Sequence, residues 1–324
     1  MKETEELMTV VKIKSEGDYV DLLEGCDSWE IAVDDCHGKV ALIDMLPRLV
    51  PAGRTADAAM VRAARTSTGK GLKTPAEDRS LVRYMYSHHH SSPAEQIVFT
   101  FFMSLPLFVA RQLIRHRTAR VNEYSLRYAE AQDKFWFPQT EAVREQGTVN
   151  KQGSGKSLNV SQAEAFIRQL ESASSDSMRD YEAAVGNGVS RELARVVLPV
   201  NLYTQWVWQM DASNLLKMLS LRQDSHAQAE IRNYADAIYL LVKPLIPDLI
   251  DAYDDYNPLR GGLAFSSAEL ELLQDGLSLT TAAGLTNAGR FNRREAAEFL
   301  VKLRRIGYDK INAEAYTSYV AFVG

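Results

Sequence analysis

The run QIVFTFFM at residues 96–103 restricts the fold of this chain more than any other segment. It is continuous, β-branched and aromatic, a pattern typical of a strand that is buried on both faces. Helical periodicity prevails over most of the remaining chain. A buried strand needs neighbouring strands and covering helices, so we expect the α/β (α+β) class, with a central twisted sheet and a helical bundle.

Further strands and helices are expected on either side of this run. Residues 10–45 alternate short β-rich pieces with Asp and Gly turns, which indicates strands near the start of the chain. A helical pattern begins at Thr55, and residues 75–87 open on a proline with acids in the first turn. A further helix should cover residues 105–114, because a Leu-Pro pair precedes a run of apolar residues.

The second half of the sequence is mostly helical in pattern. Residues 139–160 are polar and contain glycines, which indicates a surface loop or insertion. Residues 161–253 should then be helical almost throughout, and the pattern stops near Asn257-Pro258. Two more helices are expected in the tail, at 266–277 and 292–307.

Composition limits the kinds of partner that the chain can bind and the cellular compartment in which we expect it. Its 324 residues are 46% hydrophobic and 24% charged, which excludes a wholly disordered, collagen-like or coiled-coil chain. The net charge of −5 argues against a general nucleic-acid or anionic-membrane binder. Cys26 and Cys36 are too few for a disulfide framework, and neither a signal peptide nor an apolar run of about 18 residues is visible. We therefore expect a cytoplasmic protein that is neither exported nor membrane-spanning.

Two segments resemble known binding motifs only in part. Residues 153–157, GSGKS, end like a phosphate-binding loop, but Asn150 stands where the motif needs its first glycine and no hydrophobic strand precedes it. The consecutive histidines 88–90 point in different directions at a helix end and have no HExxH-type partner. We therefore expect neither a nucleoside triphosphatase nor a metal site.

Positive charge is concentrated in residues 111–127, which contain five arginines and one histidine. Part of this segment lies on an apolar helix, so the charge should not be fully solvated and an anion should compensate it. Ser125 and Arg127 offer a hydroxyl and a bidentate guanidinium, which suits a phosphate monoester. Glu123 can accept a hydrogen bond from a ribose hydroxyl or a base N–H. The segment is typical of nucleotide binding, and a buried Arg/Glu network that only stabilises an interface is the alternative.

Several motifs together resemble one enzyme family. Arg115-His116-Arg117, a gap of seven residues and Ser125 match the signature RHRx7S of flavin-dependent thymidylate synthases. Similar stretches follow the family order at 61–67 (VRAARTS), 90–95, 97–101 (IVFTF), 190–205 (SRELARVVLPVNLYTQ) and 221–232 (LRQDSHAQAEIR). The resemblance covers roughly residues 38–255, and an ordered set of separate motifs is not expected by chance.

The resemblance implies a reductive methylation of dUMP to dTMP. Methylenetetrahydrofolate would supply the carbon, and FAD reduced by NADPH would supply the hydride. It also implies a homotetramer in which each active site is assembled from more than one subunit, with no nucleic acid or membrane as partner. On this basis the chain divides into an N-terminal extension (1–37), the flavin-dependent thymidylate synthase domain (38–257) and a C-terminal helical extension (258–324).

The family pattern also assigns residues to ligands. Arg222 would be the catalytic residue, because a guanidinium beside the uracil ring favours the deprotonated, more electron-rich base and makes C5 a better nucleophile. The residues that would hold dUMP are Gln112, Arg115, Glu123, Ser125, Leu126, Arg127, Arg195 and Arg222. The residues that would line FAD are Ser67, His90, Ser92, Glu95, Arg115, His116, Arg117, Asn122, Glu123, Asp211 and His226. Arg222 and His226 are four residues apart, so one helix face should carry both.

Single residues carry further expectations. Trp206 and Trp208 are assigned to the core or an interface rather than to a ring-stacking platform. Asp211 and Lys217 stand where the family more often has uncharged groups, so the acid should either pair with the lysine or contact the flavin differently.

Other functions stay open from the sequence alone. A related flavin-dependent pyrimidine-nucleotide modifier, such as a dUMP hydroxymethylase, would share both sets of motifs. A nucleic-acid-binding module would explain the arginines by phosphate contacts. The other known route to dTMP uses a cysteine nucleophile, and it is disfavoured because both cysteines are remote in sequence from the arginine segment.

Overall fold

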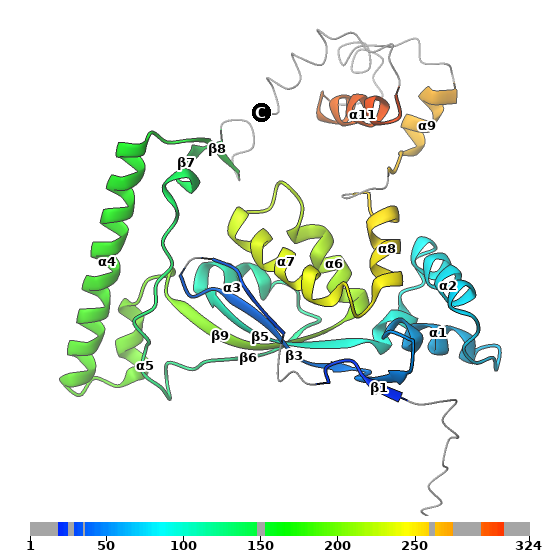
Figure 1. Ribbon diagram of the computed structural model, residues 1–324. Coiled ribbons are helices and arrows are strands. Elements are labelled where there is room, and N and C mark those ends of the chain that lie inside the picture. The colour runs from blue at the N-terminus through cyan, green and yellow to red at the C-terminus, as the bar shows by residue number, and fades with distance from the viewer. Residues whose placement is uncertain are drawn as a thin grey trace, which may run out of the picture.

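The computed structural model describes residues 19–24, 29–34, 36–147, 153–258, 263–274 and 293–307. Its centre is a five-stranded antiparallel sheet in the order β2-β3-β5-β9-β6 (Figure 1). The bounds of these strands are β2 (Trp29–Ala32), β3 (Lys39–Leu46), β5 (Val98–Pro106), β9 (Tyr203–Asp211) and β6 (Arg120–Glu123). A separate pair is formed by β1 (Tyr19–Asp21) and β4 (Leu49–Pro51). The expected central sheet is confirmed.

The run at 96–103 enters β5, the middle strand of the sheet. Phe99 and Phe101 are fully buried in the core that the sheet shares with the helices. The alternate side chains on the opposite face, Thr100 and Phe102, are only half-buried. Both faces are buried only from Met103 onward. The prediction that the whole run is buried on both faces is therefore wrong for its first part.

The largest departure from the sequence prediction is β9. Residues 161–253 are predicted to be almost wholly helical, yet 203–211 form a strand that pairs with β5 on one side and β6 on the other. The segment YTQWVWQMD alternates, since Trp206 and Trp208 are each 1% exposed while Val207 between them is 41% exposed. A period of two with aromatic and β-branched residues is the pattern of a half-buried strand. Both tryptophans belong to the core, as expected.

Helices cover one face of the sheet, and they also pack together at one end of it (Figure 1). Their bounds are α1 (Asp57–Thr66), α2 (Pro75–Ser87), α3 (Leu107–Leu113), α6 (Ala212–Arg222), α7 (Ala229–Val242) and α8 (Pro247–Tyr256). The helix at 75–87 begins as predicted: Thr74 and Glu77 form a reciprocal capping box, and Pro75 opens the first turn. The predicted stop near Asn257 is confirmed by the end of α8 at Tyr256.

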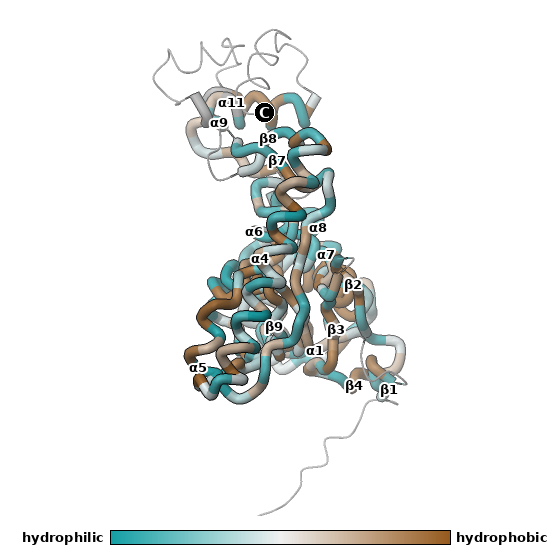
Figure 2. Tube along the Cα trace, turned by 90° about the vertical axis from the view of Figure 1, so that its left-hand side faces the viewer, coloured by the Kyte–Doolittle hydropathy of each residue, from teal (hydrophilic) through white to brown (hydrophobic). Residues whose placement is uncertain are grey.

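A long helix and a small hairpin stand at the other end of the sheet (Figure 1). α4 (Val160–Gly186) is followed by the short helices α5 (Arg191–Ala194) and η3 (Arg195–Val197). The predicted loop at 139–160 contains η2 (Thr140–Ala142) and a hairpin of β7 (Arg144–Gln146) with β8 (Ser154–Ser157). The segment GSGKS, which resembles a phosphate-binding loop, lies mostly in the exposed strand β8. Hydrophobic colour is visible around α5 in Figure 2, and the exposed apolar residues there are Val189, Leu193, Val196, Val197 and Val200.

Both predicted helices of the tail are present, as α9 (Ser267–Gln274) and α11 (Arg293–Arg305). They are joined by an ion pair of 2.8 Å between Lys302 and Glu269, whose carboxylate is nearly buried. The β-rich piece expected at residues 10–13 lies outside the described residues. None of the helices described here is long and apolar enough to cross a membrane.

Candidate active site

Three predicted site residues meet where α3 and α6 end. Arg222, the last residue of α6, donates from Nε to Nε2 of His116 at 3.0 Å and from Nη2 to the backbone carbonyl of Gln112 at 3.2 Å. Gln112 lies on α3, and His116 lies in the turn after it. The side-chain amide of Gln112 in turn donates to Oε1 of Gln228 at 2.6 Å. The predicted catalytic arginine is therefore held by two residues that lie 106 and 110 positions away in the sequence.

The hydrogen bond between Arg222 and His116 needs a neutral histidine, because the Nε2 atom that accepts it must carry no proton. Burial, and then the positive charge of Arg222, lower the pKa of His116 from 6.5 to about 4. Burial also lowers the pKa of Arg222 from its ordinary value, yet an arginine remains charged at neutral pH. Near pH 7 the pair is a charged donor and a neutral acceptor.

This pair should make the protein less stable in acid. A histidine whose pKa is lower in the folded chain contributes stability that is complete above its unfolded value of 6.5 and is lost as the pH falls through about 4. As the pH is lowered from 6.5 to about 4, the urea concentration at the unfolding midpoint should fall more steeply for the wild type than for His116→Gln. The glutamine keeps a hydrogen-bond acceptor but cannot take up a proton. Equal slopes for the two proteins would contradict the assignment of a neutral His116.

A second group collects the predicted phosphate ligands. The guanidinium of Arg127 donates from Nε to Oε2 of Glu192 at 3.1 Å, and its Nη2 lies 2.9 Å from the same oxygen. Arg195, the first residue of η3, donates from Nε to the backbone carbonyl of Glu192 at 3.3 Å. The backbone N–H of Arg127 donates to the hydroxyl of Ser125 at 3.4 Å. Ser125, Arg127 and Arg195 are therefore linked through one turn of chain and through Glu192, whose carboxylate contacts Arg127 and whose backbone carbonyl contacts Arg195.

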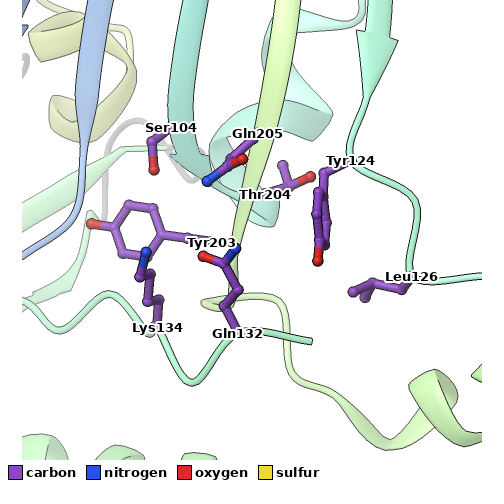
Figure 3. Close-up of a pocket in the computed structure, with 8 residues that line it drawn as sticks. All are labelled: Ser104, Tyr124, Leu126, Gln132, Lys134, Tyr203, Thr204 and Gln205. Atoms are coloured by element: carbon purple, nitrogen blue, oxygen red, sulfur yellow. The ribbon is translucent and has the colours of Figure 1, made fainter. Parts of the chain in front are cut away.

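Leu126, another predicted nucleotide contact, lines a small pocket of about 10 Å³ (Figure 3). Figure 3 shows Gln132 and Lys134 pointing toward Tyr203, while Ser104 and Gln205 face them from the sheet. The other lining residues are Tyr124 and Thr204. An open cleft of about 400 Å³ adjoins this pocket, with which it shares Ser104, Lys134 and Gln205.

Cys36 lies nearer to this pocket than its position in the sequence indicates, because it lines the adjoining cleft. The carboxylate of Asp34 shapes the turn that carries it, by accepting from the backbone of Cys36 at 2.9 Å and from the hydroxyl of Tyr203 at 2.6 Å. Cys36 is therefore remote from the arginine segment along the sequence, whereas in the fold it lines the cleft beside the pocket that contains Leu126. Cys26 lies outside the described residues, and no described hydrogen bond links Cys36 to Arg222 or Arg127.

Asn122 and Glu123 lie on the edge strand β6, beside β9. Glu123 accepts a hydrogen bond from the hydroxyl of Thr204 at 2.8 Å. Thr204 and Gln228 are contacts that the sequence reasoning missed. Each lies in a family-like stretch, Thr204 in 190–205 and Gln228 in 221–232, which was the available signal. Thr204 was missed because its stretch is also predicted to be helical, which hides its strand partner.

The other predicted flavin residues surround η1 (Ser92–Gln96) and the ends of α1 and β9. Ser67 follows the last residue of α1, and His90, Ser92 and Glu95 lie exposed in or beside η1, which packs against α1 and α6. Asp211 ends β9 and caps α6, with its carboxylate accepting from the backbone N–H and the side-chain amide of Asn214 at 2.9 and 2.7 Å. Asp211 therefore caps the N-terminus of α6. The described residues contain no ion pair between Asp211 and Lys217.

The arginines of the segment 111–127 are more exposed than the sequence predicts. The helix ends at Leu113, and all five arginines of the segment are exposed in the single chain. The premise that this charge lies on an apolar helix is therefore wrong for every arginine after Arg111. Within the described part of the chain, the guanidinium groups of Arg115 and Arg117 have no hydrogen-bond or ion-pair partner. Two such groups suit a pyrophosphate. With the serine hydroxyls and the carboxylate near η1, this donor set fits a flavin dinucleotide.

His226 does not share a helix face with Arg222, which corrects another expectation. α6 ends at Arg222, and His226 lies in the following turn, where the carboxylate of Asp224 accepts from its backbone N–H at 2.8 Å and lies 2.7 Å from its ring Nδ1. Its side chain is 64% exposed. Across the described ranges, no hydrogen bond or ion pair joins the residues around η1 to the Arg222 group or to the Arg127 group.

His88 and His89, which precede His90 of the η1 group, are also exposed. The ring of His88 stacks on that of Tyr84, with the ring centroids 4.1 Å apart. Considering only the side chains that the structure describes, no three His, Cys, Asp or Glu residues are placed to hold a metal ion.

Comparison with known proteins supports the resemblance along most of the chain. A family model described as thymidylate synthase complementing protein matches residues 48–248. A flavin-dependent thymidylate synthase of Dictyostelium discoideum is 43% identical over 292 residues, which cover 90% of this chain and 92% of that protein. One from Ruegeria pomeroyi is 45% identical over 228 residues, covering 68% and 72%. The Dictyostelium match is longer than the segment 38–255, so similarity extends into the terminal extensions.

Solved structures support the same relationship. The UMP/dUMP methylase PolB from Streptomyces cacaoi, bound with 5-Br dUMP, aligns with a TM-score of 0.61 and 30% identity. The alignment covers 68% of this chain and 96% of that chain, so nearly the whole methylase fold is present here. These matches, together with the signature at residues 115–125, show that the chain belongs to the family of flavin-dependent thymidylate synthases.

Proposed function

We propose that this chain methylates dUMP to dTMP, with methylenetetrahydrofolate as carbon donor and with the hydride from FAD that NADPH has reduced. The observation that carries the proposal is Arg222, half-buried and held by His116 and the carbonyl of Gln112. The names of the relatives support the flavin and the thymidylate product, and the methylase bound with 5-Br dUMP supports a deoxyuridine nucleotide as substrate.

Arg222 acts on the uracil ring. A guanidinium carries five N–H donors, and the bonds to His116 and Gln112 use two of them, which leaves donors for the base. Beside N3 and a carbonyl oxygen of uracil, its charge stabilises the deprotonated ring and the negative charge that develops there. C5 then attacks the transferred carbon without a covalent bond between base and protein. Partial burial strengthens the effect, because less water screens the charge.

The phosphate of dUMP binds at Ser125, Arg127 and Arg195. In the free chain the Nε and Nη2 donors of Arg127 face the carboxylate of Glu192. These are the fork donors that a phosphate takes in a bidentate contact. Substrate binding therefore exchanges a carboxylate for a phosphate at Arg127, while Arg195 and the hydroxyl of Ser125 supply further contacts.

The flavin, when bound, supplies the hydride that completes the transferred methyl group. Arg115 and Arg117 hold its pyrophosphate, because their guanidinium groups are exposed and adjacent in sequence to His116. The hydroxyls of Ser67 and Ser92 and the carboxylate of Glu95 are available for its hydroxyl and amide groups.

We also infer a homotetramer with shared active sites. A second copy that brings its residues around η1 beside Arg115 and Arg117 would complete one cofactor site. The exposed apolar side chains around α5, beside Arg195, give a surface on which another copy can pack.

The proposal is tested with the purified full chain, FAD, NADPH, methylenetetrahydrofolate and dUMP labelled with tritium at C5. Forming a bond at C5 expels the hydrogen there, so tritium should appear in water, and the protein should hold a yellow cofactor. A reaction without the folate is the control and should release none above background. Absence of both flavin binding and tritium release would overturn the proposal.

A further inference from the structure

The hydroxyl of Thr204 is the single described hydrogen-bond donor to the side chain of Glu123, at 2.8 Å from Oε1. We propose that Thr204 is a positioning residue: it fixes one oxygen of the Glu123 carboxylate so that Oε2 receives the free sugar hydroxyl of the nucleotide. This inference rests on the proposed function, in which Glu123 contacts dUMP. It gives a role to a residue that is not among those assigned to dUMP or FAD.

The register of the sheet determines this contact. Glu123 lies opposite Trp206 in the pairing of β6 with β9, and Thr204 is two residues from Trp206 on the same strand face. Diagonal neighbours of this kind are about 7–8 Å apart, a distance that a long side chain such as glutamate can bridge. The backbone N–H of Tyr124 continues the pairing by donating to Gln205 at 2.8 Å. In Figure 3 the hydroxyl of Thr204 points toward the segment that carries Tyr124.

The Thr204 hydroxyl and the Glu123 carboxylate differ in their exposure to water. Thr204 is only 6% exposed, so water cannot easily replace its hydroxyl, which has a single proton to donate. Glu123 is exposed, and the described residues offer no partner for its Oε2. A free carboxylate rotates about its last torsion and loses that freedom on binding, whereas one held at Oε1 presents Oε2 in advance. The contact therefore prepares an acceptor for a ligand.

The chemistry of the substrate identifies the ligand group. A hydroxyl or N–H must donate to a carboxylate oxygen, and dUMP has one free sugar hydroxyl, at the 3′ position. Removing the Thr204 hydroxyl should therefore weaken the contact to this hydroxyl, while the contacts of the phosphate and of the base persist. The expected signature is a loss of affinity for dUMP with little change in turnover at saturation.

The test compares Thr204→Val, which keeps the shape and removes the hydroxyl, with Thr204→Ser, which keeps the hydroxyl. Thr100→Val is the matched control, because Thr100 lies on the adjacent strand β5 and its hydroxyl accepts from Gln209 at 3.0 Å instead. For the flavin-loaded enzymes, Thr204→Val should raise the KM and the Kd for dUMP about 5- to 10-fold, with kcat changed less than about 2-fold. Thr204→Ser and Thr100→Val should stay near the wild type.

A second ligand makes the test specific. The wild type should bind 2′,3′-dideoxyuridine 5′-monophosphate more weakly than dUMP, and Thr204→Val should cause no further loss with this nucleotide. An unchanged KM in Thr204→Val, an equal defect in Thr204→Ser, or an equal penalty with the dideoxy nucleotide would overturn the role of Thr204. A wild type that neither binds dUMP nor releases tritium would instead overturn the proposed function, and this inference with it.

Discussion

Replacing Arg222 by alanine should lower turnover about 100- to 1,000-fold while the flavin stays bound. The loss is that of a preorganised charge beside the ring where negative charge develops. The structure supports a role in the reaction rather than in folding, since Arg222 donates to one side chain and one carbonyl, both at a partly exposed helix end. Turnover is measured by tritium release at saturating dUMP, and flavin content by absorbance of the purified protein.

Two companion variants sharpen this result. Arg222→Lys keeps the charge but cannot donate to His116 and to the carbonyl of Gln112 with a fixed fork, so activity should fall between that of the wild type and that of the alanine variant. Arg179→Ala removes an equal charge from α4, where Arg179 pairs with Asp176 on an exposed surface, and should leave turnover unchanged. Normal turnover in Arg222→Ala would contradict the assignment of this residue.

Replacing Trp208 by alanine should lower the free energy of unfolding by about 3–5 kcal/mol. The indole is 1% exposed in the middle of β9, and its ring centroid lies 6.0 Å from that of Phe101 on the neighbouring strand. Deleting it leaves a cavity in the core that the sheet shares with α6 and α7. The free energy is measured by urea unfolding at constant protein concentration and with the flavin removed.

Val207→Ala is the matched comparison, because it lies one residue away on the opposite, 41% exposed face of β9. It should cost about 1 kcal/mol or less. This contrast between adjacent residues is the consequence of a strand, in which successive side chains point to opposite faces. Similar losses in both variants would contradict the position of β9 in the sheet.

The sequence predicts the class of fold and most helices because those signals are local. Pro75 with the acids after it specifies the start of α2, and the residues at 96–103 specify β5. The stretch 203–211 misleads because it is continuous with helical sequence on both sides, and its alternation spans only nine residues. What makes it a strand is pairing with β5 and β6, and those partners lie about 80 to 110 positions earlier in the chain.

The sequence proposes residues for the candidate site but not the contacts between them. The family pattern assigns Gln112, His116 and Arg222 to the site, whereas their hydrogen bonds depend on where α3 and α6 end. The pairing of Arg222 with His226 on one face fails for the same reason, since the helix stops at Arg222 and Asp224 holds the histidine in the next turn. Thr204 lies in the family-like stretch 190–205, but its contact with Glu123 was not predictable, because it depends on the register of β9.

The mass of the nucleotide product tests the central claim most directly. The full chain is incubated with FAD, NADPH, methylenetetrahydrofolate and dUMP, and the nucleotides are separated and analysed by mass spectrometry. We expect dTMP, which is heavier than dUMP by one methylene group, and only when folate and reductant are both present. A product heavier by a whole formaldehyde unit would identify a hydroxymethylase, and dUMP recovered unchanged would contradict the proposed activity altogether.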